Sequence, residues 1–259
     1  MRNRLFRKGQ LNIQILLLLM VICGFSSMNA GFAQICEGNW VDRGSLPTGI
    51  NNGRGFPSFA IGGKVYIGDE SNFWEYDPST TTWTQKTAIG TINTSEQFLQ
   101  GVGFAIASQN AGYFVSGESI HKETWKYDVT NDTWSQVDDF GGVGRKNAVA
   151  FVIGDKAYVG TGTDVSGITF YDDFWEYDPV NDTWTQKSAF GGSKRGSAVG
   201  FALGNKGYVG TGRDLNGNTN DFWEYDPGTD TWTQKTAFAG TARREAVGFS
   251  LGNQGFIGT

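Results

Sequence analysis

Arginine recurs at one position of a repeated sequence pattern, six residues before a phenylalanine. The three arginines are Arg145, Arg195 and Arg243, and Arg54 lies near the equivalent place in an earlier copy. A guanidinium group presents a planar fork of N–H donors that matches the two oxygens of a carboxylate. The recurrence therefore predicts either sites for a carboxylate-bearing ligand or internal ion pairs with an Asp or Glu of a neighbouring repeat. The sequence leaves both readings open.

Catalytic chemistry that depends on several imidazoles or thiols is excluded by composition. The chain has a single histidine, His121, and two cysteines, Cys23 and Cys36. A metal site built from several histidines and a framework of several disulfides cannot be assembled from these residues. We expect His121 to be solvated in a loop, and we expect no cofactor.

Two loops hold further candidates for ligand contact. Phe170 and Tyr171 lie off the repeated aromatic pattern, and Asp164 and Asp214 each open a polar loop. Residues 214–221 are similar to an oxygen-rich calcium loop, but the sixth position lacks Gly and Tyr225 stands at the twelfth, where a bidentate Glu belongs. We therefore expect a polar turn there, without a metal.

The first 33 residues have the pattern of a secretory signal peptide. Four of the 21 basic residues lie in the first eight positions, and an apolar stretch from Leu11 to Gly24 follows. Small residues at Gly31 and Ala33 suit cleavage after Ala33, with Ala30 as the alternative. The apolar stretch is short for a membrane span, which needs about 20 residues. We expect export to the periplasm, the cell surface or the medium, with no span left after cleavage.

The remainder of the chain is acidic. The net charge is −5 for the whole sequence, and no acidic residue precedes Glu37. Nucleic-acid binding depends on clustered Lys and Arg that neutralise phosphates. The charge balance therefore argues against a nucleic-acid partner.

An internal repeat of about 50 residues organises the chain. Asp-Phe-Trp-Glu-Tyr-Asp-Pro occurs identically at 173–179 and 221–227, with weaker copies at 73–78 and 124–129. In each copy a tyrosine is followed seven residues later by a tryptophan: Tyr76 and Trp83, Tyr127 and Trp134, Tyr177 and Trp184, Tyr225 and Trp232. Each unit reads as four short strands, from an apolar first strand to a mostly polar fourth strand. This gradient suits a propeller blade, whose inner strand lies near the axis and whose outer strand faces water.

These linked features resemble the kelch repeat, whose marks are a glycine doublet after the second strand and a Tyr separated by six residues from a Trp. The Tyr–Trp spacing holds in all four units, whereas the doublet is split at Gly160-Thr-Gly162 and Gly210-Thr-Gly212. The resemblance covers about residues 38–259 and implies an all-β propeller of the architecture found in the central domain of galactose-oxidase-like proteins. It also implies that an arginine at the top of an inner strand can reach an acidic peptide.

The repeat predicts the domain organisation. After a signal peptide at 1–33, we expect a propeller at 34–259 with four complete four-stranded blades and the start of a fifth. The expected blades are 54–86, 100–137, 145–187, 195–235 and a partial 243–259, with an outer strand at 38–42. The sequence then predicts an incomplete ring whose further C-terminal blades are missing.

Loop variation indicates where such a protein recognises a partner. The loops between second and third strands differ in length and content, whereas those between first and second strands are short and repetitive. We therefore predict a non-catalytic binding module for a protein or carbohydrate, with an anionic ligand favoured by the arginines. The alternative is a sugar-processing enzyme of the sialic-acid mutarotase type, in which Arg195 would act with Asp164 or Asp214. A copper-radical oxidase is argued against, because the resemblance would require two His ligands and a Tyr–Cys crosslink.

Overall fold

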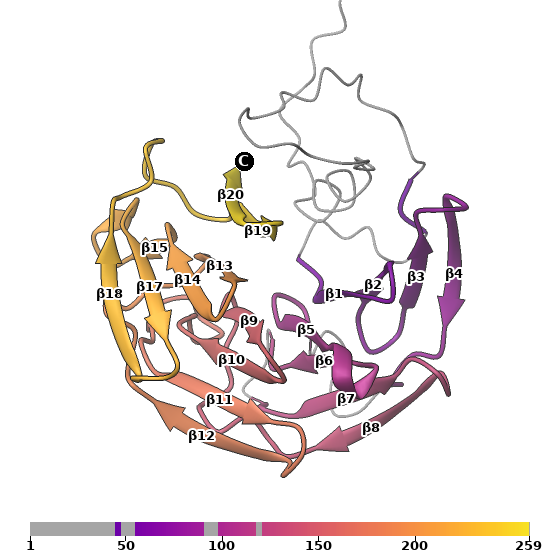
Figure 1. The fold of residues 1–259 in the computed structure, drawn as a ribbon. Helices are drawn as coiled ribbons and strands as arrows, with labels where there is room; N and C mark the ends of the chain where they lie inside the picture. The colour runs from indigo at the N-terminus through magenta and orange to yellow at the C-terminus, as the bar shows by residue number, and fades with distance from the viewer. Residues whose placement is uncertain (1–44, 48–54, 91–97, 118–120, 259) are drawn as a thin grey trace, which may run out of the picture.

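A computed structural model describes residues 45–47, 55–90, 98–117 and 121–258. The predicted signal peptide, the predicted outer strand at 38–42 and Arg54 lie outside the described residues. The described part consists of short antiparallel sheets set side by side around an axis, with the first strand of each sheet innermost (Figure 1). We call the sheets blades 1 to 5 in chain order.

Blades 1 to 4 each contain four antiparallel strands joined in chain order. Blade 1 comprises β1 (Ser58–Ile61), β2 (Lys64–Gly68), β3 (Phe73–Asp77) and β4 (Thr82–Lys86). Blade 2 comprises β5 (Val102–Ile106), β6 (Ala111–Val115), β7 (Thr124–Asp128) and β8 (Thr133–Val137). Blade 3 comprises β9 (Val149–Ile153), β10 (Lys156–Gly160), β11 (Phe174–Asp178) and β12 (Thr183–Lys187). Blade 4 comprises β13 (Val199–Leu203), β14 (Lys206–Gly210), β17 (Phe222–Asp226) and β18 (Thr231–Lys235).

Two further strand pairs complete the described sheets. Blade 5 is a two-stranded sheet of β19 (Val247–Leu251) and β20 (Gln254–Gly258). A small hairpin, β15 (Arg213–Asp214) and β16 (Gly217–Asn218), lies in the loop between β14 and β17. The structure thus confirms the predicted all-β class with repeated four-stranded sheets.

One short helical turn interrupts this pattern. The 3₁₀ turn η1 (Ala107–Gln109) joins β5 to β6 and ends at Asn110, whose φ of 45° is left-handed. The equivalent connections in blades 1, 3 and 4 are two-residue turns containing Gly62, Gly154 or Gly204. Blade 2 has Ser108 and Gln109 in place of a glycine turn, so its connection takes the longer helical form. Within the described ranges, no helix is long and apolar enough to cross a membrane.

Aromatic side chains fill the spaces between blades. Phe59, Tyr66 and Phe73 of blade 1 form a wall against which Tyr127 and Trp134 of blade 2 pack. The ring centroids of Phe73 and Tyr127 lie 4.8 Å apart, and those of Phe73 and Trp134 lie 5.0 Å apart. The recurring Tyr–Trp pair is therefore the element by which one blade packs on the blade before it.

Polar bonds fix the same pair in place. Tyr127 Oη donates to Asp132 Oδ1 at 2.6 Å, and that carboxylate also accepts the backbone N–H of Thr87 in the preceding blade at 3.0 Å. Trp134 Nε1 donates to the carbonyl oxygen of Thr87 at 2.8 Å. The same three bonds recur between blades 2 and 3 and between blades 3 and 4. Each repeat thus carries its own attachment to its predecessor.

Candidate binding face

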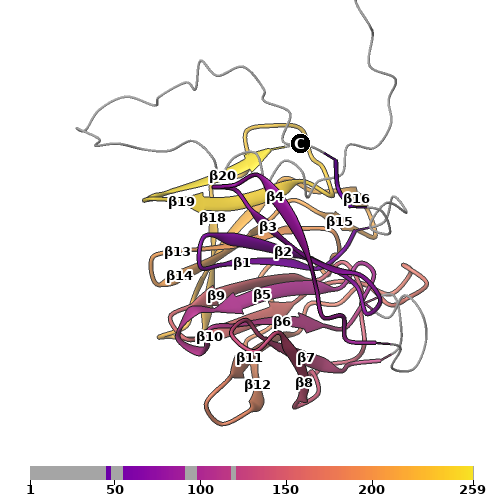
Figure 2. The same ribbon diagram turned by 90° about the vertical axis from the view of Figure 1, so that its right-hand side faces the viewer.

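The loops between second and third strands, and those between a fourth strand and the next first strand, share one face of the sheets. We call it the top face. The β15–β16 hairpin lies on it, on the right in Figure 2. All of the described candidate residues belong to loops of this face.

A chain of backbone hydrogen bonds runs from blade to blade along the inner edge of the top face. Gln100 N donates to Gly55 O, Asn147 N to Gln100 O, Ser197 N to Asn147 O and Glu245 N to Ser197 O, at 2.7 to 3.0 Å. Gln100, Asn147, Ser197 and Glu245 all adopt a left-handed φ between 53° and 57°. This conformation is uncommon for residues other than glycine, and it persists only where the surroundings fix it. Sequence reasoning missed this polar rim, although a polar residue two positions after each arginine was a visible signal.

Arg145 and Arg195 point into the protein and not toward solvent. Each is 1% exposed. Arg145 Nη1 and Nη2 donate to the two carboxylate oxygens of Asp173 at 2.6 and 2.7 Å, and Arg195 makes the same bidentate contact with Asp221 at 2.5 and 2.8 Å. The partner in each case belongs to the same blade, just before its third strand. The ion pairs therefore brace one blade internally, and they differ from the expected pairing between neighbouring blades.

Further groups enclose each guanidinium. Phe140 lies 5.0 Å from Arg145 Cζ on one side, and the Tyr171 ring lies 4.5 Å from it. Arg145 Nη1 also donates to Thr161 O at 2.9 Å. In blade 4, Phe190 lies 5.0 Å from Arg195 Cζ, and Arg195 Nη1 donates to Thr211 O at 2.9 Å. The guanidinium N–H groups of both arginines thus donate to groups within the protein. Contact between these arginines and a ligand stays a prediction.

The aspartates in these clusters remain ionised. Burial would raise the pKa of Asp173, but the hydrogen bonds and charge of Arg145 and the bond from Trp175 Nε1 outweigh it and hold the pKa below its usual value. The pKa of Asp221 is lowered in the same way by Arg195 and Trp223, against its burial. Each cluster is therefore a partly buried Arg–Asp ion pair whose carboxylate also accepts a hydrogen bond from a Trp indole.

Arg243 occupies the third copy of this position in different surroundings. It is half-buried, its Cζ lies 4.9 Å from the Phe238 ring, and its Nε donates to Thr241 O at 3.0 Å. In blade 2 the chain of rim bonds puts Phe98 at the arginine position, two residues before Gln100. Phe98 is fully buried.

Asp164 caps the loop between β10 and β11. Its carboxylate accepts the backbone N–H of Ile168 at 3.0 Å and of Thr169 at 3.1 Å, and the hydroxyl of Ser166 at 2.7 Å. The bond from the Ser166 hydroxyl, together with those from the backbone N–H groups of Thr169 and Ile168, lowers the pKa of Asp164 to about 2. Asp164 thus holds a turn, and the carboxylate does not converge on Arg195.

Asp214 caps the corresponding hairpin of blade 4. Its Oδ1 accepts Asn216 N at 2.7 Å, and its Oδ2 accepts the Ser193 hydroxyl at 2.8 Å. Ser193 Oγ in turn accepts Arg195 Nη2 at 2.9 Å. The sequence analysis had paired Arg195 with Asp214 as one possible site. In the structure the two side chains are connected through the hydroxyl of Ser193. In place of the expected polar turn, residues 213–218 form the β15–β16 hairpin, with Leu215 and Asn216 in its turn.

Large aliphatic side chains stand exposed at the tips of these two capped loops. Ile168 is 73% exposed, Leu215 is 81% exposed, and Val165 is 38% exposed. Val165 and Leu215 hold the same position in the repeated pattern Thr-Gly-x-Asp-(Val/Leu), directly after the capping aspartate. Exposed apolar side chains of this size are ordinary when isolated but informative when grouped on rigid loops. The sequence analysis did not single them out.

The remaining candidates have modest roles in the structure. Phe170 is half-buried and forms an isolated β-bridge with Thr163. Tyr171 is half-buried, and its ring lies over Arg145, as described above. His121 Nδ1 lies 3.6 Å from Glu123 Oε1, with one third of its side chain exposed. These residues support loops of the top face and do not converge on one pocket.

The repeated four-stranded sheets and the loop-built top face define an all-β protein of the propeller type. Among solved structures, the chain is similar to the structure of YjhT, with 17% sequence identity and a TM-score of 0.64 over 76% of this chain and 69% of that chain. In all, 280 solved chains are similar to it, so the fold is common and by itself indicates no single activity. No known protein family and no curated protein matches the sequence.

Proposed function

We propose that this chain is an exported, non-catalytic binding module that contacts a partner through the top loops of blades 3 and 4. The observation that carries the proposal is the pair of exposed aliphatic tips, Ile168 with Val165 and Leu215, on capped loops of successive blades. Because these side chains are largely exposed, they bury little apolar surface when the protein folds and contribute little to its stability. Burying them against a partner would remove apolar surface from water at roughly 25 cal/mol per Å².

The two loops are rigid before any partner arrives. Each tip is held by an aspartate that accepts backbone N–H groups, and the loop of blade 3 is closed further by the bonds from Asp164 N to Thr169 O and from Gly167 N to Asp164 O. A loop that is already ordered loses less conformational entropy when it binds. Preorganised apolar tips are therefore suited to serve as the energetic centre of an interface.

Charged side chains of both signs lie in loops of the same face. Lys194 is 62% exposed and lies 3.5 Å from Asp172 Oδ1, and Arg213 is exposed at the base of the β15–β16 hairpin. These cations offer a carboxylate-bearing partner a contact that the engaged Arg145 and Arg195 do not. We therefore favour a protein partner that combines an apolar contact with acidic side chains.

Selection from a random peptide library displayed on phage tests the proposal, with the immobilised full chain as target. We expect enriched peptides that combine aliphatic and acidic residues. Their affinity should fall at least tenfold for the double variant Ile168→Asn and Leu215→Asn. Val180→Asn is the matched control, because Val180 is 77% exposed in a loop of the opposite face. Equal loss with Val180→Asn, or unchanged binding by the double variant, would contradict the proposal.

The hydrogen-bond chain from Arg195 through Ser193 to Asp214 supports one alternative, a sugar-processing enzyme of the sialic-acid mutarotase type. Because the donors of Arg195 are engaged within the protein, Asp214 would contact the acidic sugar and move a proton at its ring oxygen, and Arg195 would position Ser193 and, through it, Asp214. Exchange between the anomers of sialic acid, followed by proton NMR, tests this alternative. If the chain accelerates the exchange and Asp214→Asn abolishes that acceleration, the result favours the enzyme. If the exchange keeps its uncatalysed rate, the result favours the binding module.

A further inference from the structure

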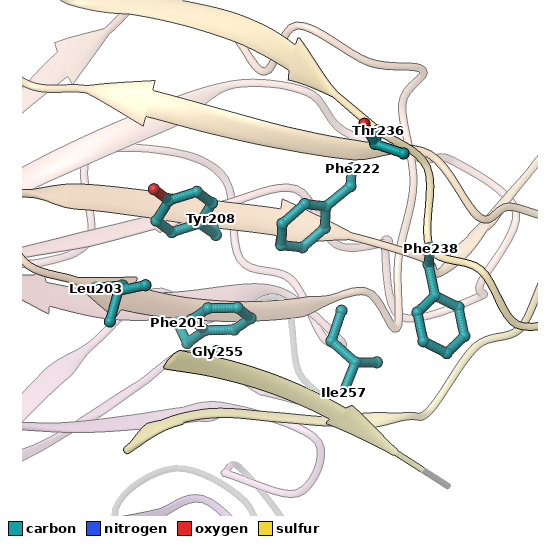
Figure 3. A pocket seen from close by; sticks show the side chains of 8 residues that line it. All are labelled: Phe201, Leu203, Tyr208, Phe222, Thr236, Phe238, Gly255 and Ile257. Carbon is teal, nitrogen blue, oxygen red and sulfur yellow. The ribbon is translucent and has the colours of Figure 1, made fainter. Parts of the chain in front are cut away.

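Blade 4 has an apolar cavity on its flank and a polar hairpin on its top face. The cavity, of about 380 Å³, is lined by Phe201, Phe222 and Tyr208 among others (Figure 3). The Tyr208 hydroxyl donates to Glu224 Oε2 at 2.7 Å, so the cavity offers mainly packing surface. The groups of blade 4 that can react with one another lie instead in the β15–β16 hairpin.

Asn216 and Gly217 form an Asn-Gly dipeptide at the tip of this hairpin. Asn216 is exposed, and its side-chain amide makes no hydrogen bond with any residue that the structure describes. A Cβ at Gly217 would meet nothing within 4 Å, so the space beside this residue is open. Among the described asparagines, Asn216 is the one that a glycine follows.

This dipeptide holds the groups of a reaction that needs no enzyme. A base removes the proton of the Gly217 backbone N–H, and the nitrogen attacks Cγ of Asn216. The bond from Cγ to Nδ2 breaks, ammonia leaves with the proton, and a five-membered imide remains. Water then opens the imide at Cγ, which gives aspartate, or at the main-chain carbonyl, which gives isoaspartate. Glycine hinders the attack least because it has no Cβ, and asparagine is a thermolabile residue.

A second asparagine of the same hairpin, Asn218, lacks these conditions. It is also exposed, but Thr219 follows it, and the branched side chain of Thr219 crowds the nitrogen that would attack. The backbone N–H of Thr219 also donates to Gly212 O at 2.9 Å. Asn218 is therefore an internal control for Asn216.

The hairpin slows this reaction without preventing it. Gly217 pairs with Asp214 across the hairpin, and Asp214 Oδ1 accepts the backbone N–H of Asn216 at 2.7 Å. The hairpin has two residue pairs in all, the other being Arg213 with Asn218. A short exposed element of this kind opens locally at a low free energy, and the attacking nitrogen is then released.

We propose that Asn216 is a modification site, at which spontaneous deamidation converts the neutral tip of the blade 4 loop into an acidic one. Aspartate adds a negative charge beside the exposed Leu215, and isoaspartate also lengthens the backbone of the turn by one methylene group. Because the new charge repels a carboxylate of the partner, binding at this tip declines as the protein ages. This last step rests on the function proposed for the top face, whereas the conversion of Asn216 does not.

Incubation of the full chain in neutral buffer, followed by peptide mapping with mass spectrometry, tests the conversion. Trypsin cuts after Arg213 and Lys235, so one peptide carries both Asn216 and Asn218. We expect Asn216 to gain about 1 Da, the difference between NH₂ and OH, and fragmentation by electron transfer to find aspartate and isoaspartate there. A sample taken at the start measures conversion during handling. Conversion of Asn216 no faster than that of Asn218 would overturn the proposal.

Asp214→Ala tests the protection by the hairpin. Without the cap the hairpin opens more often, so Asn216 should convert several-fold faster than in the parent chain. An unchanged rate would contradict the protection.

Asn216→Ser tests the effect on binding. Serine is the residue of the blade 3 loop at this place, Ser166, and it has no amide to lose. The affinity of the parent chain for its selected peptides should fall about threefold or more during the incubation, while Asn216→Ser keeps its affinity. Equal loss in the two proteins, or conversion with unchanged affinity, would overturn the switch. If the fresh chain selects no peptide, the function proposed for the top face fails, and the mass measurement still decides the conversion of Asn216.

Discussion

Blades 3 and 4 differ from blade 2 at the point where each chain segment enters its inner strand. In blades 3 and 4 a buried arginine meets an aspartate in the same blade, and a tryptophan N–H completes the cluster. Blade 2 has the buried Phe98 at the arginine position, and the indole nitrogens of Trp74 and Trp125 are buried without a hydrogen-bond partner. The same backbone geometry is thus supported by an ion pair in blades 3 and 4 and by apolar packing in blade 2.

The comparison shows that the backbone conformation of the rim is the same from blade to blade, whereas the side chains that support it differ. The left-handed rim residues and their backbone bonds continue through Gln100 in blade 2 without an arginine beside them. A buried ion pair offsets its desolvation cost only with good geometry, whereas a phenylalanine of similar reach needs no partner. The arginine clusters therefore fix orientation around the top loops of blades 3 and 4, where the exposed tips lie.

The largest expected effect comes from removing one arginine. Arg195→Ala leaves the carboxylate of Asp221 without its bidentate partner, and we expect a loss of about 3–5 kcal/mol in the free energy of unfolding. Denaturant unfolding followed by tryptophan fluorescence measures it. Lys194→Ala, at the neighbouring exposed position, should change stability by about 0.5 kcal/mol or less. A similar loss for both variants would remove the distinction between the buried pair and the surface pair.

The double variant Arg195→Ala and Asp221→Ala sharpens this result. If the cost of the single change is an unpaired buried charge, removing the aspartate as well should recover part of the loss. The double variant still lacks the bond from Trp223, so recovery will be incomplete. Additive losses from the two substitutions would contradict an ion pair as the source of stability.

Acid should expose the same difference between blades. The pKa values of Asp173 and Asp221 are lowered in the folded state, so their contribution is present above the unfolded pKa of about 3.9 and is lost as the pH falls through the folded values. In Arg195→Ala, Asp221 lacks the hydrogen bonds and charge of the arginine that lower its pKa, so acid should remove less stability from the variant than from the parent chain. The stability gap between the parent chain and this variant should therefore shrink as the pH falls below about 4. Urea unfolding at several pH values between 3 and 7 measures the gap, and a constant gap would contradict this assignment.

The Tyr–Asp attachments show a second, smaller difference between blades. Tyr225 Oη donates to Asp230 Oδ1 at 2.7 Å, whereas Thr81 replaces the aspartate in blade 1 and Tyr76 Oη is buried without a partner. Tyr225→Phe should cost about 1 kcal/mol, because Asp230 loses a hydrogen bond. Tyr76→Phe should be neutral or slightly stabilising, since it removes an unsatisfied polar atom. Thermal unfolding of the two variants compares them, and equal losses would show that the Tyr76 hydroxyl is satisfied in solution.

The repeat made the sheets predictable, because a 50-residue period with linked Tyr and Trp positions leaves few alternative strand assignments. The six-residue spacing also placed the arginines correctly at the entry to the inner strands of blades 3 and 4. Their direction was harder to predict, since Asp173 and Asp221 lie 28 and 26 residues further along the chain. A usable signal was present in the sequence. The leading Asp of the Asp-Phe-Trp-Glu-Tyr motif occurs in the two copies that have the arginine and is absent from the copy at 73–78.

The rim and the loop tips were less accessible to sequence reasoning. A left-handed φ at Asn147 or Ser197 is imposed by the bond to the preceding blade and not by the residue type, so local preference does not reveal it. The exposure of Leu215 depends on a two-strand hairpin that the polar sequence around it does not distinguish from an irregular loop.

The smallest expected effect on stability concerns those tips. Leu215→Asn removes an aliphatic side chain that is 81% exposed, so we expect a change of about 0.5 kcal/mol or less in the free energy of unfolding. Asp214→Ala, one residue away, removes the cap of the same hairpin and the bond from Ser193, and should cost about 1 kcal/mol. Both changes should weaken a partner that docks on the hairpin, the first by deleting the contact and the second by loosening the loop. Denaturant unfolding and peptide binding measured on the same samples separate the two causes. A large loss of stability in Leu215→Asn would show that the side chain packs against the protein, and the top loops of blades 3 and 4 would then lose their apolar contact.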